Sequence, residues 1–350
     1  MRVLATIGFS FSAGVFLAAL LPWNGWQLYA AGGVLLLALA WLFAARKQKY
    51  FRRGLLILLP LAVSLAYFAG YDHLVRQPIE NRCGAASDFT ATVCDWPQAT
   101  ERGARVTVEL EGYHRARAVL YGEAELLAAR PGDTVTGTAQ WQSAAHFDSD
   151  DVTHFNARGV YALLYGREDV RLSAGDGDAL RWLPQRAGKA FREKVAAIWD
   201  DPRVSGFLTA ELTGDKSAMD NGDYLAMQET GLAHLFAVSG LHCAFLVTLL
   251  ALLISRRQRL LCAVTIPLLL FYMVMVGMSP SVVRACIMQI FLLIAPLFRR
   301  GSDPLTSLAA ALLVILLCNP FAAASVSLQL SFSATLGMVL LSPRLYKLLT

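Results

Sequence analysis

The stretch FRRGLLILLPLAVSLAYFAGY, residues 51–71, decides the fold class of this chain. Two arginines open it, and no charged side chain follows between Gly54 and Tyr71. About 18 helical residues at 1.5 Å each match the roughly 30 Å hydrocarbon core of a bilayer. We therefore expect a transmembrane helix whose first end is basic and lies in water.

Similar apolar segments recur along the chain, which has 350 residues, is 56% hydrophobic and has a mean hydropathy of +0.47. The other candidate spans are Leu4–Leu21, Gln27–Ala45, Leu232–Ile254, Leu260–Met278, Ser281–Phe298, Leu305–Cys318 and Phe321–Leu341. Leu305–Cys318 is short and needs tilting, local thinning or help from its neighbours. The first segment lacks a small-residue cleavage site, so it predicts a retained anchor. The fold class is a polytopic α-helical membrane protein.

Charged residues divide the chain and set its orientation. Residues 1–71 carry six basic and no acidic side chains, whereas residues 72–200 carry fifteen basic and nineteen acidic ones, a net charge of −4. Short loops rich in Lys and Arg stay in the cytoplasm. The loop Arg46–Arg53 then directs residues 72–230 outward, and the later basic clusters at Arg256–Arg259, Arg299–Arg300 and Arg344–Lys347 fall on the cytoplasmic side. We expect an inner-membrane protein with one extracytoplasmic insertion.

The inserted region has period-two patterns typical of half-buried strands. Five strands are expected at Phe89–Asp95, Arg105–Tyr113, Arg115–Glu123, Asp133–Trp141 and Gly159–Leu172. Five short strands suit a small closed barrel of the OB type, and a plain β-sandwich is the alternative. The predicted organisation is three helices (1–71), an OB-like domain (72–175), interfacial amphipathic helices (176–230) and a helical domain of five spans (231–350).

A basic cluster surrounds one predicted hairpin of this domain. It consists of Arg102, Arg105, Arg115 and Arg117, with Tyr113 nearby. Single-stranded nucleic acid binds to basic grooves with aromatic stacking platforms, so these residues are candidates for such contacts. The alternative is a solvated strand face balanced by neighbouring glutamates, which the net negative charge favours.

The cysteines and histidines give weaker signals. Cys83 and Cys94 lie in the outer region, where a disulfide can persist, and either a disulfide or two free thiols fits the sequence. The remaining cysteines lie in apolar segments and are expected to pack. No spacing resembles a metal site, and the sequence implies no cofactor.

The membrane segment GLAHLFAVSGLH, residues 231–242, contains unusual polar groups for a span. Intramembrane ionisable residues usually face a bundle interior or a water-filled path. His234, Ser239, Gly240 and His242 are therefore candidates to line a path, and close packing of small residues is the alternative. Gly214-Asp215-Lys216, before this segment, predicts a turn between two helices at the outer surface.

Two later features extend this set. Arg284 lies about one turn inside a segment that Ser279-Pro280 can cap, so it either snorkels to the interface or presents a positive charge at a pore mouth. Gln329 and Ser331 belong to a polar stripe in the last segment, which either lines a path or joins helices by hydrogen bonds.

These motifs together resemble the ComEC competence proteins. The resemblance rests on the Gly214–Lys216 turn, the Gly231–His242 string, Arg284-Ala285, Asn319-Pro320 and Gln329-Leu330-Ser331-Phe332. Phe155–Val160 also resembles the family's close of the outer barrel, with Asn156 where a Tyr is often seen. Family members usually continue into further helices and often a metallo-β-lactamase-like domain. This sequence lacks an H-x-H-x-D-H cluster, so we expect that it is not itself that nuclease and is the front part of a longer protein.

The resemblance implies a channel for single-stranded DNA in natural transformation, with a DNA receptor outside, an ATP-driven motor inside and a possible homo-oligomeric assembly. No phosphate-binding Gly-rich loop occurs in the chain itself. Two alternatives stay open. One is a transporter of another solute or an envelope-assembly protein, although no internal repeat supports it. The other is an intramembrane serine hydrolase built on Ser239, for which no suitably placed base is evident.

Overall fold

The computed structural model describes residues 3–20, 26–44, 51–100, 103–113, 116–145, 154–167, 169–177, 179–214, 219–231, 240–254, 257–298, 301 and 303–349. They form two compact units. The first comprises Met1–Gly177 and Leu308–Thr350, and the second comprises Asp178–Ser307.

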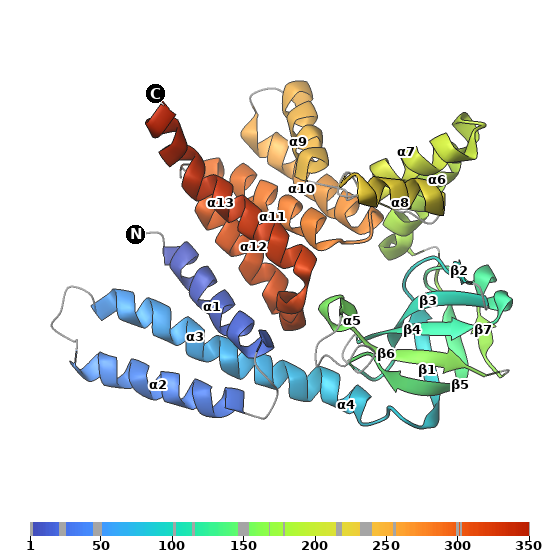
Figure 1. The fold of residues 1–350 in the computed structure, drawn as a ribbon, viewed down its shortest axis with the longest axis horizontal. Helices are drawn as coiled ribbons and strands as arrows, with labels where there is room; N and C mark the ends of the chain where they lie inside the picture. Colours follow the sequence, from blue (N-terminus) through green and yellow to red (C-terminus); the bar gives the residue numbers. More distant parts are fainter. Residues whose placement is uncertain are drawn as a thin grey trace. The chain divides into compact units, whose positions relative to one another are not determined.

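The first unit begins with three apolar helices, α1 (Val3–Leu20), α2 (Trp26–Ala44) and α3 (Phe51–Tyr71). Both α1 and α2 pack against α3. The approach of α1 is close, because a Cβ added to Gly14 would collide with Ser64 Oγ and come within 3.1 Å of Leu61 O. Helix α3 continues through a π-helical turn (Asp72–Arg76) and α4 (Gln77–Glu80) into the first strand (Figure 1). The apolar helix is thus joined directly to the β domain.

The β domain is a closed five-stranded barrel. Its strands are β1 (Ala86–Val93), β3 (Gly103–Leu110), β4 (Arg117–Gly122), β5 (Thr134–Ser143) and β6 (Val160–Gly166). They pair in the order β1-β3-β4-β6-β5, and β5 pairs again with β1 to close the ring. Only the β4–β6 pairing among these is parallel. Closure confirms the barrel and excludes the β-sandwich alternative.

Burial alternates along β1, β3, β4 and β5, as the period-two pattern predicted, whereas Val160–Leu164 of β6 are buried on both faces. The largest fully buried side chains in the barrel are Trp141, Leu120, Leu163 and Leu164. Short strands β2 (Gln98–Thr100) and β7 (Arg171–Ser173) extend the edges, and the connections include the 3-10 helix Ala124–Ala128 and α5 (His154–Ala157).

The last predicted strand, Gly159–Leu172, was wrong in length. The structure divides it into β6 and β7, which both pair with β5 but at different places along it. A turn separates them, in which Val170 N donates to Arg167 O at 3.2 Å and Arg167 N donates to Thr138 O at 3.1 Å. Both strands run antiparallel to β5, β6 along Ala139–Ser143 and β7 along Thr134–Thr136, so the chain keeps its direction across this interruption.

The first unit ends with α12 (Pro304–Cys318), the 3-10 helix Pro320–Ala324 and α13 (Val326–Leu349). Two expectations are corrected here. The segment predicted from Phe321 begins as a separate 3-10 helix, because Asn319 Oδ1 accepts from Phe321 N at 3.0 Å and starts a new cap. Helix α13 then runs beyond Leu341, so Arg344 and Lys347 lie in a helix and not in a turn.

The second unit contains only helices among its described residues. After the 3-10 turn Leu180–Trp182 come α6 (Leu183–Ile198), α7 (Pro202–Thr213) and α8 (Asn221–Glu229). Helices α9 (Gly240–Ile254), α10 (Gln258–Met275) and α11 (Pro280–Ile294) follow, and a 3-10 turn (Ala295–Phe298) ends the series. Helix α7 ends where Gly214 adopts the left-handed conformation with φ 74°, which fits the predicted break between two helices.

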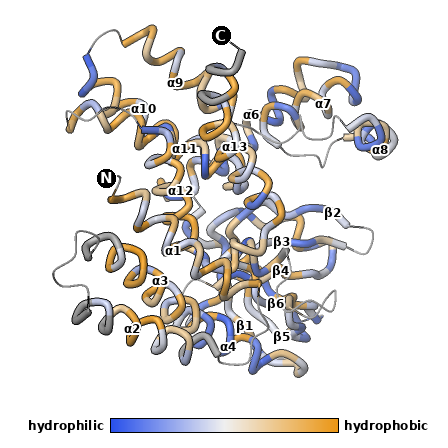
Figure 2. Tube along the Cα trace, turned by 60° about the vertical axis from the view of Figure 1, so that its left-hand side comes forward, coloured by the Kyte–Doolittle hydropathy of each residue, from blue (hydrophilic) through white to orange (hydrophobic). Residues whose placement is uncertain are grey.

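Four helices in the described part of the chain are long and apolar enough to cross a membrane: Val3–Leu20, Gly54–Glu80, Gln258–Met275 and Pro280–Phe298. Shorter apolar helices are Tyr29–Ala38, Gly240–Ile254, Pro304–Cys318 and Val326–Ser342. Figure 2 shows the hydrophobic colour along α2, α3 and α10, and the mixed colouring of the barrel strands. The chain is therefore a helical membrane protein with an attached barrel.

Candidate functional site

An aromatic and basic row crosses the outer face of the barrel. Arg105 on β3 lies opposite Tyr121 on β4, and Tyr121 lies opposite Tyr165 on β6. The two tyrosine rings are stacked, with centroids 5.2 Å apart and planes 13° from parallel. Arg117 lies on the same outer face of β4, opposite Glu109. We call Arg105, Tyr121 and Tyr165 the outer row.

Local contacts hold the outer row in place. Arg105 donates from Nε and Nη2 to Gln98 Oε1, at 3.0 and 2.7 Å, so the adjoining strand β2 orients its guanidinium. Tyr165 stays 38% exposed, and partial burial together with Tyr121 raises the pKa of its hydroxyl. Tyr165 is therefore neutral at physiological pH, and the stacked rings present their surface beside a positive charge.

Tyr113 does not belong to this row. It lies in the turn after β3, where its ring centroid is 6.2 Å from that of Trp141 and 5.4 Å from Arg82 Cζ. A pocket of about 590 Å³ forms there, and Asp88 and Glu111 also line it. The sequence grouped Tyr113 with the arginines because they are close along the chain. Arg102 and Arg115 lie outside the described residues.

The suggested Cys83–Cys94 disulfide is absent, and both residues are free thiols. Cys83 Sγ donates to Ile79 O at 3.5 Å, and Cys94 Sγ contacts Thr92 O at 3.6 Å. The physical reason is β1, which separates them by eight extended residues, or roughly 25 Å, whereas a disulfide needs Cα atoms within about 7 Å. Burial, with a contribution from Glu80, raises the pKa of Cys83 to about 11.

Two sequence motifs meet at a joint between the barrel and the helices of the first unit. Asn319 Nδ2 donates to Asn156 O at 2.9 Å and to Ala157 O at 3.1 Å, while its Oδ1 accepts from Tyr161 Oη at 3.4 Å. Tyr161 Oη also lies 3.2 Å from Tyr71 Oη, within hydrogen-bonding distance. We call Asn156, Ala157, Tyr161 and Asn319 the joint.

An aromatic cluster surrounds the joint. The Phe321 ring is edge-on to both Tyr71 and Tyr161, at 6.0 and 5.8 Å, and Arg76 Cζ lies 5.7 Å from its centroid. Desolvation raises the pKa of Tyr161 well above its usual value, so it remains a hydrogen-bond donor. The motifs at residues 155–160 and 319–320 therefore fix the barrel to α3 and α12.

The last polar stripe forms local hydrogen bonds. Gln329 Nε2 donates to Ala323 O at 2.9 Å, and Ser325 Oγ accepts from Leu328 N at 3.4 Å. The Ser331 carbonyl accepts from Thr335 Oγ1 at 2.9 Å. Gln329 thus stabilises the break between the 3-10 helix and α13, and its lining of a path stays a prediction.

In the second unit, α9 and α11 approach through small side chains. A Cβ added to Gly240 would lie 3.5 Å from Ala285 Cβ, and Cys243 Sγ lies 3.4 Å from Cys286 Sγ. The buried cluster around them includes Leu269, Val282 and Leu293. This geometry is typical of close helix packing in membranes, the alternative that the sequence had left open for Gly240.

Other path candidates are only partly placed. His242 is partly buried in the first turn of α9, and Arg284 is partly buried in the second turn of α11. Ser279 and Pro280 begin α11 as predicted, but the Ser279 side chain forms no cap hydrogen bond. His234 and Ser239 lie outside the described residues. Since Gln329 and Ser331 belong to the first unit, a common lining of all these residues remains a prediction.

Sequence reasoning missed Tyr165 and Tyr161 as members of these sites. Both lie on β6, where Tyr165 is exposed and Tyr161 is buried against Tyr71 and Phe321. The parallel β4–β6 pairing that brings Tyr165 to Tyr121 joins distant parts of the sequence. No local pattern specifies that pairing.

Comparison with known proteins identifies the class of the helical region. Residues 212–350 match the family described as "Competence protein". A relative, "ComE operon protein 3" of Bacillus subtilis (strain 168), is 31% identical over 144 residues. That alignment covers 40% of this chain and 19% of the relative, so the chain spans well under two thirds of it. No solved structure matches.

The fold and this match together define a class: a membrane protein with a closed β-barrel and a competence-type helical region. The resemblance drawn from the motifs is confirmed over residues 212–350, which match the competence family and are similar to ComE operon protein 3.

Proposed function

We propose that this protein forms a channel that carries single-stranded DNA across the inner membrane during natural transformation. The observation that carries the proposal is the competence-family match over residues 212–350, which falls on the apolar helices α9 to α13. Competence is the uptake of DNA, and a membrane protein of this class is suited to the membrane-crossing step.

The barrel is proposed to be an OB-like domain that receives the strand. Numbered in chain order, its five long strands pair as 1-2-3-5-4-1, with strands 3 and 5 parallel. OB barrels bind oligonucleotides across strands 2 and 3, which correspond here to β3 and β4. Arg105, Arg117 and Tyr121 lie on these strands. Bases would stack against the tyrosines of the outer row, and the arginines would contact phosphates.

An extracytoplasmic position of the barrel is supported by charge. Helix α3 contains Arg52 and Arg53 in its first turn and leads at its other end, through α4, to β1. The positive-inside rule retains the basic end in the cytoplasm, which directs the barrel outward. The barrel would then meet DNA delivered by an outer receptor.

A polar path through the membrane is required because each nucleotide carries a negative charge that hydrocarbon cannot solvate. Arg284 is the candidate to attract phosphate near the mouth, and His234, Ser239 and His242 are candidates for the lining. A membrane potential that is negative inside opposes the entry of an anion. The proposal therefore includes an ATP-driven motor in the cytoplasm as a partner, and assigns no catalytic residue to this chain.

The test follows labelled duplex DNA into a DNase-protected internal pool, in cells carrying the intact gene, its deletion, or variants. We expect the deletion to abolish internal label while surface binding is retained, and Arg284→Ala to reduce uptake at normal protein level. The double variant Tyr121→Ala with Tyr165→Ala should weaken binding of single-stranded oligonucleotide by the purified chain. Arg171→Ala, an exposed arginine on β7, is the matched control. Normal uptake by the deletion strain would overturn the channel proposal.

A further inference from the structure

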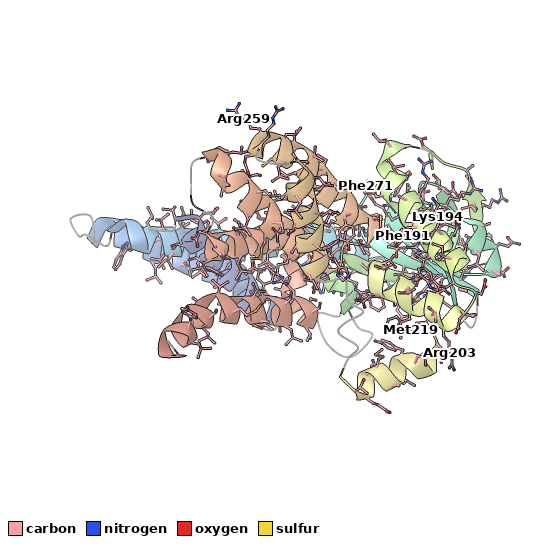
Figure 3. The ribbon with its side chains drawn as sticks, turned by 90° about the horizontal axis from the view of Figure 1, so that it is seen from above. Phe191, Lys194, Arg203, Met219, Arg259 and Phe271 are labelled. Atoms are coloured by element: carbon pink, nitrogen blue, oxygen red, sulfur yellow. The ribbon has the colours of Figure 1, made fainter. Side chains whose placement is uncertain are left out.

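A groove of about 560 Å³ lies between α7 and α8 in the second unit. Its walls are apolar and include Phe207, Leu208 and Met227, with Met219 at one side (Figure 3). A groove of this volume with apolar walls suits one flexible apolar chain or a small ligand.

Two opposite charges stand at the rim of the groove. Arg203 Nε lies 3.9 Å from Asp223 Oδ2, and the two side chains are 73% and 46% exposed. An ion pair that is so exposed and has such a long N–O distance contributes little to the stability of the fold. Both groups are therefore accessible to a ligand, and the rim carries no net charge.

The groove belongs to a helical layer at the end of a membrane-spanning helix. Helix α10, with 18 residues, is about 27 Å long, close to the thickness of the hydrocarbon core. Helix α6 crosses its last turn so closely that a Cβ added to Gly188 would lie 3.0 Å from Met275 O. Arg259 marks the opposite end of α10 (Figure 3). Because α7 packs against α6, the groove lies near the level at which the hydrocarbon ends.

The exposed face of α6 is suited to the same level. Leu183, Phe191 and Ile198 are exposed on this helix, at 39%, 37% and 67%. Lys194, also exposed, lies one turn from Phe191 (Figure 3). Apolar side chains with an adjacent lysine that reaches headgroups are typical of a helix in the membrane interface.

We propose that the α7–α8 groove binds a zwitterionic phospholipid of the phosphatidylethanolamine type. One acyl chain lies along Phe207 and Met227, the phosphate contacts Arg203, and the ammonium contacts Asp223. A ligand with an apolar chain and paired opposite charges matches both the walls and the rim. DNA matches neither, because the walls offer no row of stacking rings and the Asp223 carboxylate repels phosphate. An anionic lipid lacks the cation for Asp223.

The experiment uses the full chain purified in mild detergent, with native mass spectrometry after addition of phosphatidylethanolamine or phosphatidylglycerol of identical acyl chains. Wild type should retain one phosphatidylethanolamine in preference to phosphatidylglycerol. Ala226→Trp, which fills the groove, should lower retention roughly tenfold. Leu225→Trp is the matched control, since Leu225 is exposed on α8 and does not line the groove.

A second variant tests the rim without filling the groove. Asp223→Lys makes the rim doubly positive, so the preference should change to phosphatidylglycerol. Equal retention of both lipids by wild type and Asp223→Lys would overturn the proposal, as would unchanged retention in Ala226→Trp. Displacement of the bound lipid by a single-stranded oligonucleotide would assign the groove to DNA and also overturn it. DNA uptake is not the readout, so failure here leaves the channel proposal unaffected.

Discussion

On neighbouring strands of the barrel, an apolar side chain is buried and a polar one faces outward: Leu120 is fully buried, whereas Arg105 is exposed. In α9 the arrangement is reversed. Leu252 is 77% exposed, while the small residues Gly240 and Cys243 face α11. The same residue types thus occupy opposite positions in two regions of one chain.

The difference follows from the solvent that each region meets. Water surrounds the barrel, so burial of apolar area drives its folding, at about 25 cal/mol per Å². Hydrocarbon is as apolar as leucine, so helices in a bilayer associate through close packing of small residues. An exposed leucine is therefore costly on the barrel and neutral on α9.

The largest expected effect on stability comes from the same substitution, Leu to Ala, made once in the barrel and once in α9. Leu120→Ala should lower the free energy of unfolding of the barrel by about 2–5 kcal/mol, because it removes buried methyl groups and leaves a cavity. Leu252→Ala should change stability by less than about 0.5 kcal/mol, because its side chain packs little. Hydrogen exchange of β4 and α9 amides in the detergent-solubilised chain measures both. Equal losses would contradict the comparison.

The joint between barrel and helices should give the next effect. Asn319→Ala leaves the carbonyls of Asn156 and Ala157 without their donor, which should cost about 2–4 kcal/mol. Tyr161→Phe should cost less, since its two hydrogen bonds are long, at 3.2 and 3.4 Å. Thermal unfolding of the purified chain measures these losses, with the exposed Asn81→Ala as control. If Asn319→Ala were as stable as Asn81→Ala, the joint would not contribute to the stability of the chain, and this prediction would be wrong.

Close packing in the second unit is tested by enlarging one glycine. Gly240→Leu forces a bulky side chain toward Ala285 and should cost about 1–3 kcal/mol. Gly337→Leu on α13 is the matched control, because a Cβ there meets nothing within 4 Å. Crosslinking between Cys243 and Cys286 reports the α9–α11 contact. Undiminished crosslinking in Gly240→Leu would show that the helices do not need a small residue there.

The smallest effect concerns the surface of the barrel at low pH. Thr138 donates to Asp169 from its hydroxyl and its backbone N–H, and these hydrogen bonds lower the pKa of the carboxyl below its ordinary value of 3.8. The stabilisation of the folded barrel by ionised Asp169 is complete above the pKa of this carboxyl in the unfolded chain. It disappears as the pH falls through the lower pKa of the same carboxyl in the folded chain. Asp169→Asn should therefore be less stable than wild type near neutrality, and the two should converge below that pKa. A gap that persists at acid pH would contradict this assignment.

Much of the architecture followed from local patterns. Apolar length predicted apolar helices, four of which are long enough among the described residues to cross a membrane, and alternation predicted the barrel strands to within a few residues. Spacing along the sequence gave wrong predictions where the outcome depended on which strands pair. Cys83 and Cys94 are close in sequence but separated by an extended strand, and Gly159–Leu172 held two strands because β5 could pair with both.

The candidate site residues likewise fall into those that local sequence predicted and those that depend on strand pairing. Sequence alone selected Arg105 and Arg117 as basic candidates on the barrel, because residue type and alternation are local properties. It placed Tyr113 among them and missed Tyr165, since the parallel pairing of β4 and β6 lies outside any short window. The polar Gln329 was a candidate either to line a path or to form hydrogen bonds between helices; its side chain donates to Ala323 O at 2.9 Å, and the lining stays a prediction.

The sequence by itself determined which segments are apolar enough for a bilayer and which have the strand pattern of a domain in water, because hydrophobicity and charge act segment by segment. Only the tertiary structure decided that the barrel closes, that Tyr121 stacks on Tyr165, and that Asn319 binds the chain near Asn156. Each of these depends on contacts between residues far apart along the chain, whose geometry arises only when the strands and helices have packed together.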